Sequence, residues 1–484
     1  MKLYIYFSVH EKLFERVAAE LRDRHGVEAL GGFVWGKDQA DLLRNSPVPW
    51  WRLDTFTEWL QDLPSHQLDL AELERIEGRY GLPTLSRMIY GERHLLNRYS
   101  HEDVLKIIQL VAHRWERLMD DDRPDAIFVE SIDSLPLLLM YAVARDRGIP
   151  IIHLDSGRID RRVAITRDPF MTWSDVDQSF RAKQGQPLTG PARDRAVAFL
   201  DSFRETRSRI QTPRRWMYPR PRLDDLRRLA MASRRYFRDP LNPILRSPLA
   251  MARQKATRLI NHVRSSRFDL FEQPVPGEKY VLFPLHYQPE VSTLVMGTFY
   301  LDQPALIGDI AKSLPVGYRL YVKEHFFAIG RRPIEEYRRI AQCFNVRLIG
   351  PMHDPIKMVE NASAVATIAG TMGWEAVLME RPTITFGDSF YNSYPQVYRA
   401  GLVAKLEWPK LLRQALTTFK PDRELLLKYI SAVLENTYEG YFSFDNPVTD
   451  PERCMRDENY QNIAGVLAAE LGLTRPPLRS RGAA

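Results

Sequence analysis

Hydrophobic positions along the chain follow two alternating patterns. Short runs of β-branched and aromatic residues, typical of buried strands, are followed by longer stretches in which apolar residues recur every three or four positions. This alternation predicts a parallel α/β architecture. In the first half, the clearest unit is a strand at Ala126–Glu130, a helix over Leu135–Arg147 and a strand at Ile149–Leu154. Together they form one βαβ crossover.

A second series of strands begins after the turn at residues 274–277. The strands are expected near Tyr280–Pro284, Arg319–Lys323, Val346–Ile349, Ala364–Ile368 and Thr383–Phe386. We therefore expect two doubly wound parallel-sheet domains with a cleft between them, because open α/β sheets bind ligands at the carboxyl ends of their strands. The expected segments are 1–200 as a first α/β domain, 201–275 as a basic helical insert, 276–425 as a second α/β domain, and 426–484 as C-terminal helices with a disordered tail.

Length and composition agree with a folded protein of two domains. The chain has 484 residues, of which 44% are hydrophobic and 27% charged, and a single core rarely extends beyond about 300 residues. The longest apolar run, Leu135–Ala144, is too short to cross a bilayer. Residues 1–9 read as a first strand and not as an export signal, so we expect a cytoplasmic protein. Two cysteines, Cys343 and Cys454, exclude a disulfide framework or a cysteine-based zinc site.

Positive charge is concentrated in one segment. Residues 204–267 hold 18 Arg or Lys against four acids, a local charge of +14, so the other 420 residues sum to 7 − 14 = −7. Apolar residues at helical spacing predict helices with basic outer faces. Such a segment can attract an anionic surface, and we expect it to hold the protein peripherally at the inner face of the cell membrane. The alternative is a solvated helical insert.

The strongest local motif is a glycine turn between a strand and a helix, Thr367-Ile-Ala-Gly-Thr-Met-Gly-Trp-Glu375. Glycines allow a ligand to approach the backbone, and the helix presents free N–H groups that suit a phosphate. We therefore assign nucleotide binding to Gly370, Thr371 and Gly373, with Glu375 on the ribose. The alternative is a plain strand-to-helix turn.

Two further motifs stand at predicted strand ends of the same domain. Lys323 and His325 close the run Tyr-Val-Lys-Glu-His and are assigned to nucleotide binding, because cations there would neutralise phosphate. Glycosyl-transfer chemistry needs a carboxylate, and Glu290 in the first loop of the domain is one candidate. The alternatives are a solvated charged loop, and an acid placed for the helix dipole.

The first domain contributes a comparable strand end, His153-Leu-Asp-Ser-Gly-Arg158. Asp155 is the second candidate for the catalytic carboxylate. Arg158 and Arg162 are candidates for binding an acidic sugar or an acceptor. The alternative is that these arginines only pair with nearby aspartates.

Taken in order and spacing, these elements resemble the capsule polysaccharide biosynthesis family, which includes transferases that use CMP-activated 3-deoxy-octulosonic acid (Kdo). The resemblance spans residues 280–391, with weaker support over 149–170. It implies a glycosyltransferase of the GT-B fold that needs no metal or cofactor. It also implies a nucleotide-sugar donor on the second domain and a surface polysaccharide or lipid-linked acceptor on the first. The motifs that carry it are Val-Lys-Glu-His325, Gly-Thr-Met-Gly-Trp-Glu-Ala376, Arg381-Pro382 and Phe-Gly-Asp-Ser-Phe-Tyr391.

The sequence departs from the family pattern at three positions. Phe326 follows His325, where the family usually has proline. His286 occupies the place of a family glutamine and is assigned to substrate binding, and Glu290 replaces an aspartate, which preserves a carboxylate.

Three other readings remain open. A non-hydrolysing sugar-nucleotide 2-epimerase shares two such domains and a similar glycine turn. A nucleic-acid-binding protein is suggested by aromatic residues among the arginines of 204–267, but this reading leaves the strand-end motifs unexplained, so no nucleic acid is expected. A scaffold with a degenerate site is the third.

Overall fold

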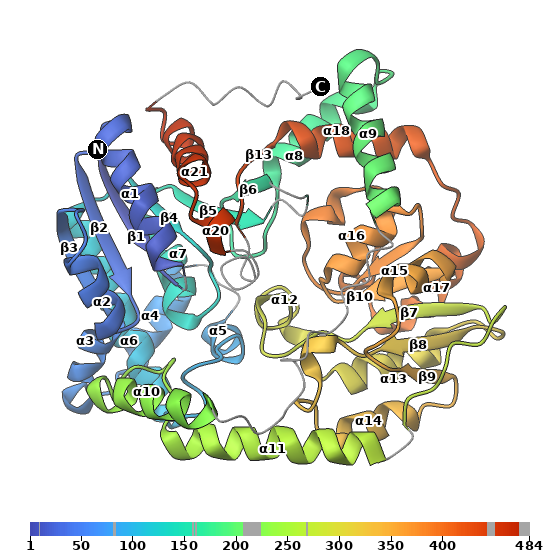
Figure 1. Ribbon diagram of the computed structural model, residues 1–484, viewed down its shortest axis with the longest axis horizontal. Helices are drawn as coiled ribbons and strands as arrows, with labels where there is room; N and C mark the ends of the chain where they lie inside the picture. Colours follow the sequence, from blue (N-terminus) through green and yellow to red (C-terminus); the bar gives the residue numbers. More distant parts are fainter. Residues whose placement is uncertain are drawn as a thin grey trace. The chain divides into compact units, whose positions relative to one another are not determined.

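The chain folds into two α/β units, drawn in Figure 1. The computed structural model describes residues 1–8, 10–80, 84–156, 159, 162–206, 224–267, 270–442 and 451–473. The first unit comprises residues 1–176, 231–246 and 433–484, and the second comprises 177–230 and 247–432.

The sheet of the first unit has the strand order β13-β6-β5-β4-β1-β2-β3. The five strands from β5 to β3 are parallel, β6 runs antiparallel to β5, and β13 runs antiparallel to β6. The strands are β1 Lys2–Tyr6, β2 Ala29–Val34, β3 Trp50–Thr55, β4 Ala126–Val129, β5 Ile151–Ser156, β6 Arg162–Thr166 and β13 Thr437–Glu439.

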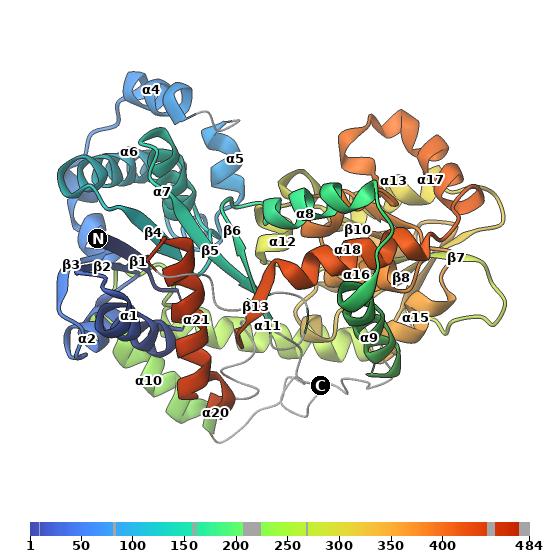
Figure 2. The same cartoon turned by 90° about the horizontal axis from the view of Figure 1, so that it is seen from above.

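Helices cover both faces of this sheet, as Figure 2 shows. Leu3 and Ile5 of β1 join one buried cluster with apolar residues of α1 and α21. Tyr4 points to the other face, where its ring meets Trp115 of α6 edge-on at 6.1 Å. The alternation of side chains along a strand thus gives each helical layer its own core. The helices are α1 Glu11–His25, α2 Lys37–Arg44, α3 Phe56–Trp59, α4 Leu70–Tyr80, α5 Leu85–Tyr90, α6 His101–Arg117, α7 Leu135–Asp146, α20 Pro451–Cys454 and α21 Asp457–Glu470.

The sheet of the second unit has the order β12-β11-β10-β7-β8-β9, and its strands are all parallel. The strands are β7 Tyr280–Pro284, β8 Arg319–Lys323, β9 Val346–Ile349, β10 Ala364–Thr367, β11 Thr383–Thr385 and β12 Val397–Arg399. The strands β7, β10 and β11 are buried throughout, as expected for a parallel sheet covered on both faces.

Two hydrophobic clusters fix the helices of the second unit. One joins β7, β8 and β10 to α13, α14 and α17, and the other joins the opposite sheet face to α15 and α16. The helices are α9 Gly190–Thr206, α11 Pro248–Arg267, α12 Val291–Leu294, α13 Gln303–Ser313, α14 Ile334–Ala341, α15 Pro355–Asn361, α16 Thr371–Leu378 and α17 Trp408–Thr417. Three further helices, α8 Ser174–Gln184, α10 Asp224–Arg238 and α18 Arg423–Glu435, lie where the chain passes from one unit to the other.

The predicted α/β class with two mainly parallel sheets is confirmed. Three strands of the second sheet have the expected bounds, and β10 and β11 each end one residue early. The expected strand at Ile149–Leu154 starts instead at Ile151, because Ile149 N–H donates to Ala144 and closes the preceding helix. The antiparallel strands β6 and β13 were not anticipated.

The Arg-rich helix α10 does not face its apolar residues inward as the sequence predicted. Leu226 and Phe237 are 74% and 72% exposed. Arg235 and Arg238 instead bind Asp38 of α2, with Arg235 Nε 2.8 Å and Arg238 NH1 3.0 Å from its carboxylate. These ion pairs, and not apolar burial, attach α10 to the first unit.

Within the described residues, no helix combines the length and the apolar character that crossing a membrane requires. The expected disordered tail falls largely on residues 474–484, which lie outside the described part.

Candidate functional site

Most of the predicted site residues lie at the carboxyl edge of the second sheet. Strands β7 and β10 are neighbours there, although the chain runs from β7 toward β9 on one side and from β10 toward β12 on the other. Open α/β sheets bind ligands at such a switch point. The loops that follow β7, β8 and β10 are therefore the candidate site.

His286 joins the loop after β7 to the loop after β10. Its backbone N–H donates to Gln303 Oε1 at 2.8 Å, and its carbonyl accepts from Gln303 Nε2 at 3.0 Å. Ala369 N–H approaches the ring Nε2 to 3.4 Å, as does Thr367 Oγ1. Burial, helped by the charges of His325 and Arg332, lowers the pKa of His286 to about 3. The ring is therefore neutral at pH 7.

The glycine turn after β10 packs closely against this histidine. Gly370 is the N-cap residue of α16, and its N–H donates to Thr367 Oγ1 at 3.1 Å. A Cβ atom at Gly370 would lie 2.9 Å from Thr367 Oγ1 and 3.1 Å from His286 Nε2, so a side chain there would displace both. Thr371 follows with an exposed side chain. The N–H groups of Thr371 and Met372 have no acceptor within the helix and can meet an anionic ligand, whereas the N–H of Gly373 donates to the carbonyl of Gly370 at 3.0 Å.

Gly373 was expected to leave room for a ligand, but the side chain of Tyr391 lies against it. The hydroxyl of Tyr391 lies 2.2 Å from the place where a Cβ atom of Gly373 would be, and it donates to the carbonyl of Gly370 at 2.7 Å. Packing of Tyr391 thus accounts for the glycine. Its assignment to nucleotide binding remains a prediction.

Glu375 lies one turn into α16. Its Oε2 atom is shielded from solvent and has no hydrogen-bond partner among the described residues. Burial raises the pKa of this carboxyl to about 7. A buried carboxylate oxygen with no partner is an exception that calls for an explanation. The assignment of Glu375 to a ribose remains a prediction.

The loop after β8 holds Lys323 and His325. Lys323 is 5% exposed, and its Nζ lies 3.2 Å from the carbonyl of Glu324 and 3.3 Å from that of Pro351. Burial lowers the pKa of Lys323 to about 8, against the opposing charges of Glu324 and Asp354. The ammonium group therefore keeps its charge at pH 7.

His325 is oriented by its own loop. Phe327 N–H donates to Nδ1 at 3.2 Å, and the ring stacks on Phe326 at a centroid distance of 4.7 Å. Phe326, which replaces the family's proline, thus supports the ring. Burial lowers the pKa of His325 to about 4. A neutral ring that accepts at Nδ1 carries its proton on Nε2, so His325 can donate one hydrogen bond to a ligand.

A buried ion pair holds the two histidine loops together. Arg332 donates through Nε to Glu324 Oε2 at 2.8 Å and through NH2 to the carbonyl of His286 at 3.0 Å. Glu324 Oε1 accepts from the N–H of His325 at 2.6 Å. Arg332 follows the Lys-Glu-His motif as a second arginine of the same loop. The structure shows that its charge is used inside the unit, and only the neighbouring Arg331 is exposed, where it lies 5.0 Å over the ring of Tyr287.

Glu290 closes the loop after β7 as the N-cap residue of α12. Its side chain makes no capping hydrogen bond, and Ser292 Oγ lies 3.4 Å from its Oε2. The alternative of an acid placed for the helix dipole requires only this position at the N-terminus of α12, so it stays open. The catalytic assignment remains a prediction.

The remaining predicted residues belong to the first unit. Asp155 is buried near the end of β5, beside Ala164 of β6. Arg162 begins β6 and donates to Thr437 Oγ1 and to the carbonyl of Leu434, both at 2.7 Å. Its guanidinium thus anchors the start of β13, and its contact with substrate remains a prediction. Arg158 lies outside the described residues.

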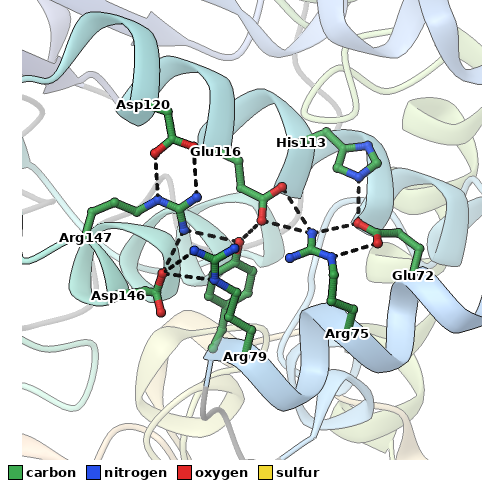
Figure 3. Close-up of polar contacts among 9 residues, drawn as sticks. Glu72, Arg75, Arg79, His113, Glu116, Asp120, Asp146 and Arg147 are labelled. Atoms are coloured by element: carbon green, nitrogen blue, oxygen red, sulfur yellow. Dashed lines mark hydrogen bonds and ion pairs between the residues drawn. The ribbon is translucent and has the colours of Figure 1, made fainter.

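Figure 3 shows a charged cluster on α4, α6 and α7 of the first unit that the sequence analysis did not single out. Possible ligand atoms of Glu72, His113 and Glu116 lie within 4.8 Å of one another. Arg75, however, bridges the two glutamates at 2.7 and 3.0 Å. Because its guanidinium already contacts an oxygen of both carboxylates, we interpret the cluster as an ion-pair network.

Comparisons with known proteins give partial likenesses. No family model matches the chain. A stretch of 93 residues is 37% identical to Protein FixF of Sinorhizobium fredii and covers 19% of the chain and 22% of that protein. The match thus spans about a fifth of the relative's length.

Two solved structures illustrate the likenesses found. The first is a β-Kdo 2,4 transferase, KpsC of Thermosulfurimonas dismutans, with 17% identity, 67% of this chain and 83% of that chain covered, and a TM-score of 0.37. The second is a UDP-GlcNAc 2-epimerase from Neisseria meningitidis bound to UDP-GlcNAc, with 11% identity, coverage of 90% and 98%, and a TM-score of 0.25. At these scores the likenesses assign neither a family nor an activity to this chain.

Proposed function

We propose that the chain is a glycosyltransferase of the capsule polysaccharide type, which moves a sugar from a nucleotide donor to a surface polysaccharide or lipid-linked acceptor. The observation that carries the proposal is the switch-point edge of the second sheet. There the glycine turn of α16 contacts the neutral ring of His286, and the loop of His286 is tied through Arg332 and Glu324 to the loop of His325. The buried carboxyl of Glu375 follows on the same helix.

The groups at this edge suit a nucleotide with a phosphate. The N–H groups at the start of α16 and the Nε2 proton of His325 would bind phosphate oxygens. Lys323 would add a positive charge at close range, and Glu375 would accept from the ribose. These groups need no metal ion to neutralise a single phosphate. We propose a CMP-activated acidic sugar such as Kdo as the donor, by resemblance to the capsule family.

The experiment is a thermal-shift screen with CMP, UDP, GDP and their sugars. A ligand at 100 times its dissociation constant adds about 2.7 kcal/mol to the free energy of unfolding, and we expect the largest shift with a cytidine nucleotide. Thr371→Val and His325→Ala should each weaken binding by about 1–3 kcal/mol. Thr257→Val, an exposed threonine of α11, is the matched control and should bind as the wild type does. If the two site variants bind every nucleotide as well as the wild type, the site is misplaced.

A second proposal concerns attachment to the membrane, where a lipid-linked acceptor would be found. We propose that the basic segment 204–267 holds the protein against the anionic inner face of the cell membrane. The supporting observation is the solvent side of α10, where exposed Leu226 and Phe237 accompany exposed Arg227, Arg228 and Arg234. Apolar side chains beside arginines on one helix suit an anionic membrane surface.

A further inference from the structure

The first unit has its own switch point. Its strands β1 and β4 are neighbours, while the chain leaves β1 toward β3 and leaves β4 toward β6. The loop that follows β4, residues 130–134, lies at this carboxyl edge, where open α/β sheets bind ligands. None of the motifs in the sequence analysis falls on this loop.

Three side chains of this loop carry buried polar atoms without partners. Ser131 and Asp133 are 1% exposed and Ser134 is fully buried. Ser131 Oγ, Ser134 Oγ and Asp133 Oδ1 are shielded from solvent and have no hydrogen-bond partner among the described residues. Buried polar groups in native proteins almost always have one, so three such atoms within four residues point to a ligand that completes them.

Ser134 is the clearest case, because its hydroxyl does not cap the helix that begins next to it. It is the N-cap residue of α7, where a serine hydroxyl normally accepts from the helix, yet it makes no such bond. Glu92 Oε2 accepts from Leu135 N–H at 2.8 Å instead, and the carbonyl of Ser134 accepts from Leu137 N–H at 3.1 Å. The hydroxyl is therefore left for another partner.

The charges around the loop narrow the class of ligand. The carboxyl of Glu92 already accepts from the N–H of Leu135 at the start of α7, so it would repel an anion at this helix end. Arg93 is ion-paired with Asp133, which offsets the charge that would attract a cation. Two hydroxyls and one carboxylate oxygen offer both donors and acceptors, as neutral hydroxyl groups require.

We propose that Ser131, Asp133 and Ser134 bind hydroxyl groups of a saccharide at the carboxyl edge of β4. That this saccharide is the acceptor of transfer rests on the proposed function. The edge also adjoins Asp155, since Val129 of β4 pairs with His153 of β5 and Asp155 lies two residues further along β5. The charges of Asp133 and Asp155 both act on the buried ring of His153. Sugar hydroxyls bound at Ser131 would thus lie near a candidate catalytic carboxylate.

The test uses the full chain and a panel of methyl glycosides of hexoses and of Kdo, observed by saturation-transfer NMR at millimolar concentration. We expect at least one glycoside to bind the wild type. Ser131→Ala and Ser134→Ala should each weaken that binding about threefold, and the double variant about tenfold, as for the loss of one or two hydrogen bonds. Ser86→Ala, on the exposed side of α5, is the matched control. Nucleotide binding, measured in parallel, should be unchanged in all variants.

Two results would overturn the inference: no glycoside binds a wild type that does bind nucleotide, or the double variant binds glycosides as well as the wild type does. In the second case the loop holds water only. A third result separates the two proposals: glycosides bind, the serine variants bind them more weakly, and no nucleotide binds the wild type or any variant. The saccharide site then stands and the proposed transferase function fails.

Discussion

At the scale of single residues, burial sets the protonation states of the candidate nucleotide site. The pKa values of His286 and His325 are lowered to about 3 and about 4, so both rings are neutral at pH 7. Lys323, with a pKa lowered to about 8, keeps its charge. The carboxyl of Glu375, raised to about 7, changes its charge within the physiological range.

The raised pKa of Glu375 predicts a stability that depends on pH. Burial favours the protonated carboxyl, so the folded state binds a proton that the unfolded chain, with a pKa near 4.5, releases. Ionisation of this carboxyl therefore does not change the free energy of unfolding below pH 4.5. It lowers that free energy increasingly between pH 4.5 and pH 7, and by the full amount above pH 7. Because Glu375→Gln removes this cost, the gain in the free energy of unfolding over the wild type should grow by about 1–3 kcal/mol between pH 5 and pH 8. Urea unfolding of both proteins at pH 5 and at pH 8 measures this difference in free energy. A difference that is the same at the two pH values would contradict the account.

At the residue scale, the sequence singled out some residues of this candidate site and missed others. Gly370, His325 and Glu375 stood out because each follows a strand end in a motif with a known chemical use. Glu324 and Tyr391 did not stand out, because the contribution of each depends on a partner elsewhere in the sequence. Glu324 acts through Arg332, and Tyr391 fills the space beside a glycine 18 residues earlier.

At the scale of secondary-structure elements, the buried pair of Arg332 and Glu324 holds the loops after β7 and β8 in one arrangement. Removing one partner of a buried ion pair leaves an uncompensated charge, which typically costs about 3–5 kcal/mol. Arg332→Met should lower the free energy of unfolding by about that amount. Arg331→Met is the matched control, because Arg331 is exposed, and it should cost less than about 1 kcal/mol. Equal midpoints of denaturant unfolding for the two variants would show that the pair does not brace the loops.

The helix α10 carries a prediction of its own at this scale. Each basic residue near an anionic leaflet contributes about 1 kcal/mol to binding. Replacing Arg227, Arg228 and Arg234 together by glutamine should therefore weaken co-sedimentation with anionic liposomes strongly. Replacing Arg235 and Arg238 should weaken it less, because their charges are paired with Asp38.

Salt and lipid composition complete the liposome test. Binding of the wild type should decrease as salt is raised, because screening shortens the reach of the charges. Equal partitioning onto neutral and anionic vesicles, or no binding at all, would contradict a membrane-attaching segment.

The elements themselves were largely predictable from the pattern of the sequence. Strands such as Tyr280–Pro284 are continuous apolar runs bounded by turn residues, which is how buried parallel strands appear. Strand β13 was not predictable in the same way. It is three residues long and pairs with β6 from more than 270 positions further along the chain, so no local signal marks it.

At the scale of the whole molecule, the two candidate catalytic carboxylates belong to different units. Glu290 is in the second unit, with the proposed nucleotide site, and Asp155 is in the first, near the proposed saccharide site. We prefer Glu290, because its loop belongs to the unit that holds the proposed nucleotide site. The sequence indicated two units and their sheets, but it did not indicate the polar loop after β4, whose importance arises only from burial.

The central claim is glycosyl transfer, and the most direct measurement follows both products when the protein is given CMP-Kdo and a lipid-linked saccharide. We predict that free CMP and the lengthened saccharide appear in equal amounts. Glu290→Gln should reduce turnover with little effect on nucleotide affinity, as expected for a group that acts in the transition state. Full turnover in both Glu290→Gln and Asp155→Asn would exclude these carboxylates. A sugar nucleotide epimerised without release of free nucleotide, in a parallel reaction with UDP-GlcNAc, would contradict the transferase account itself.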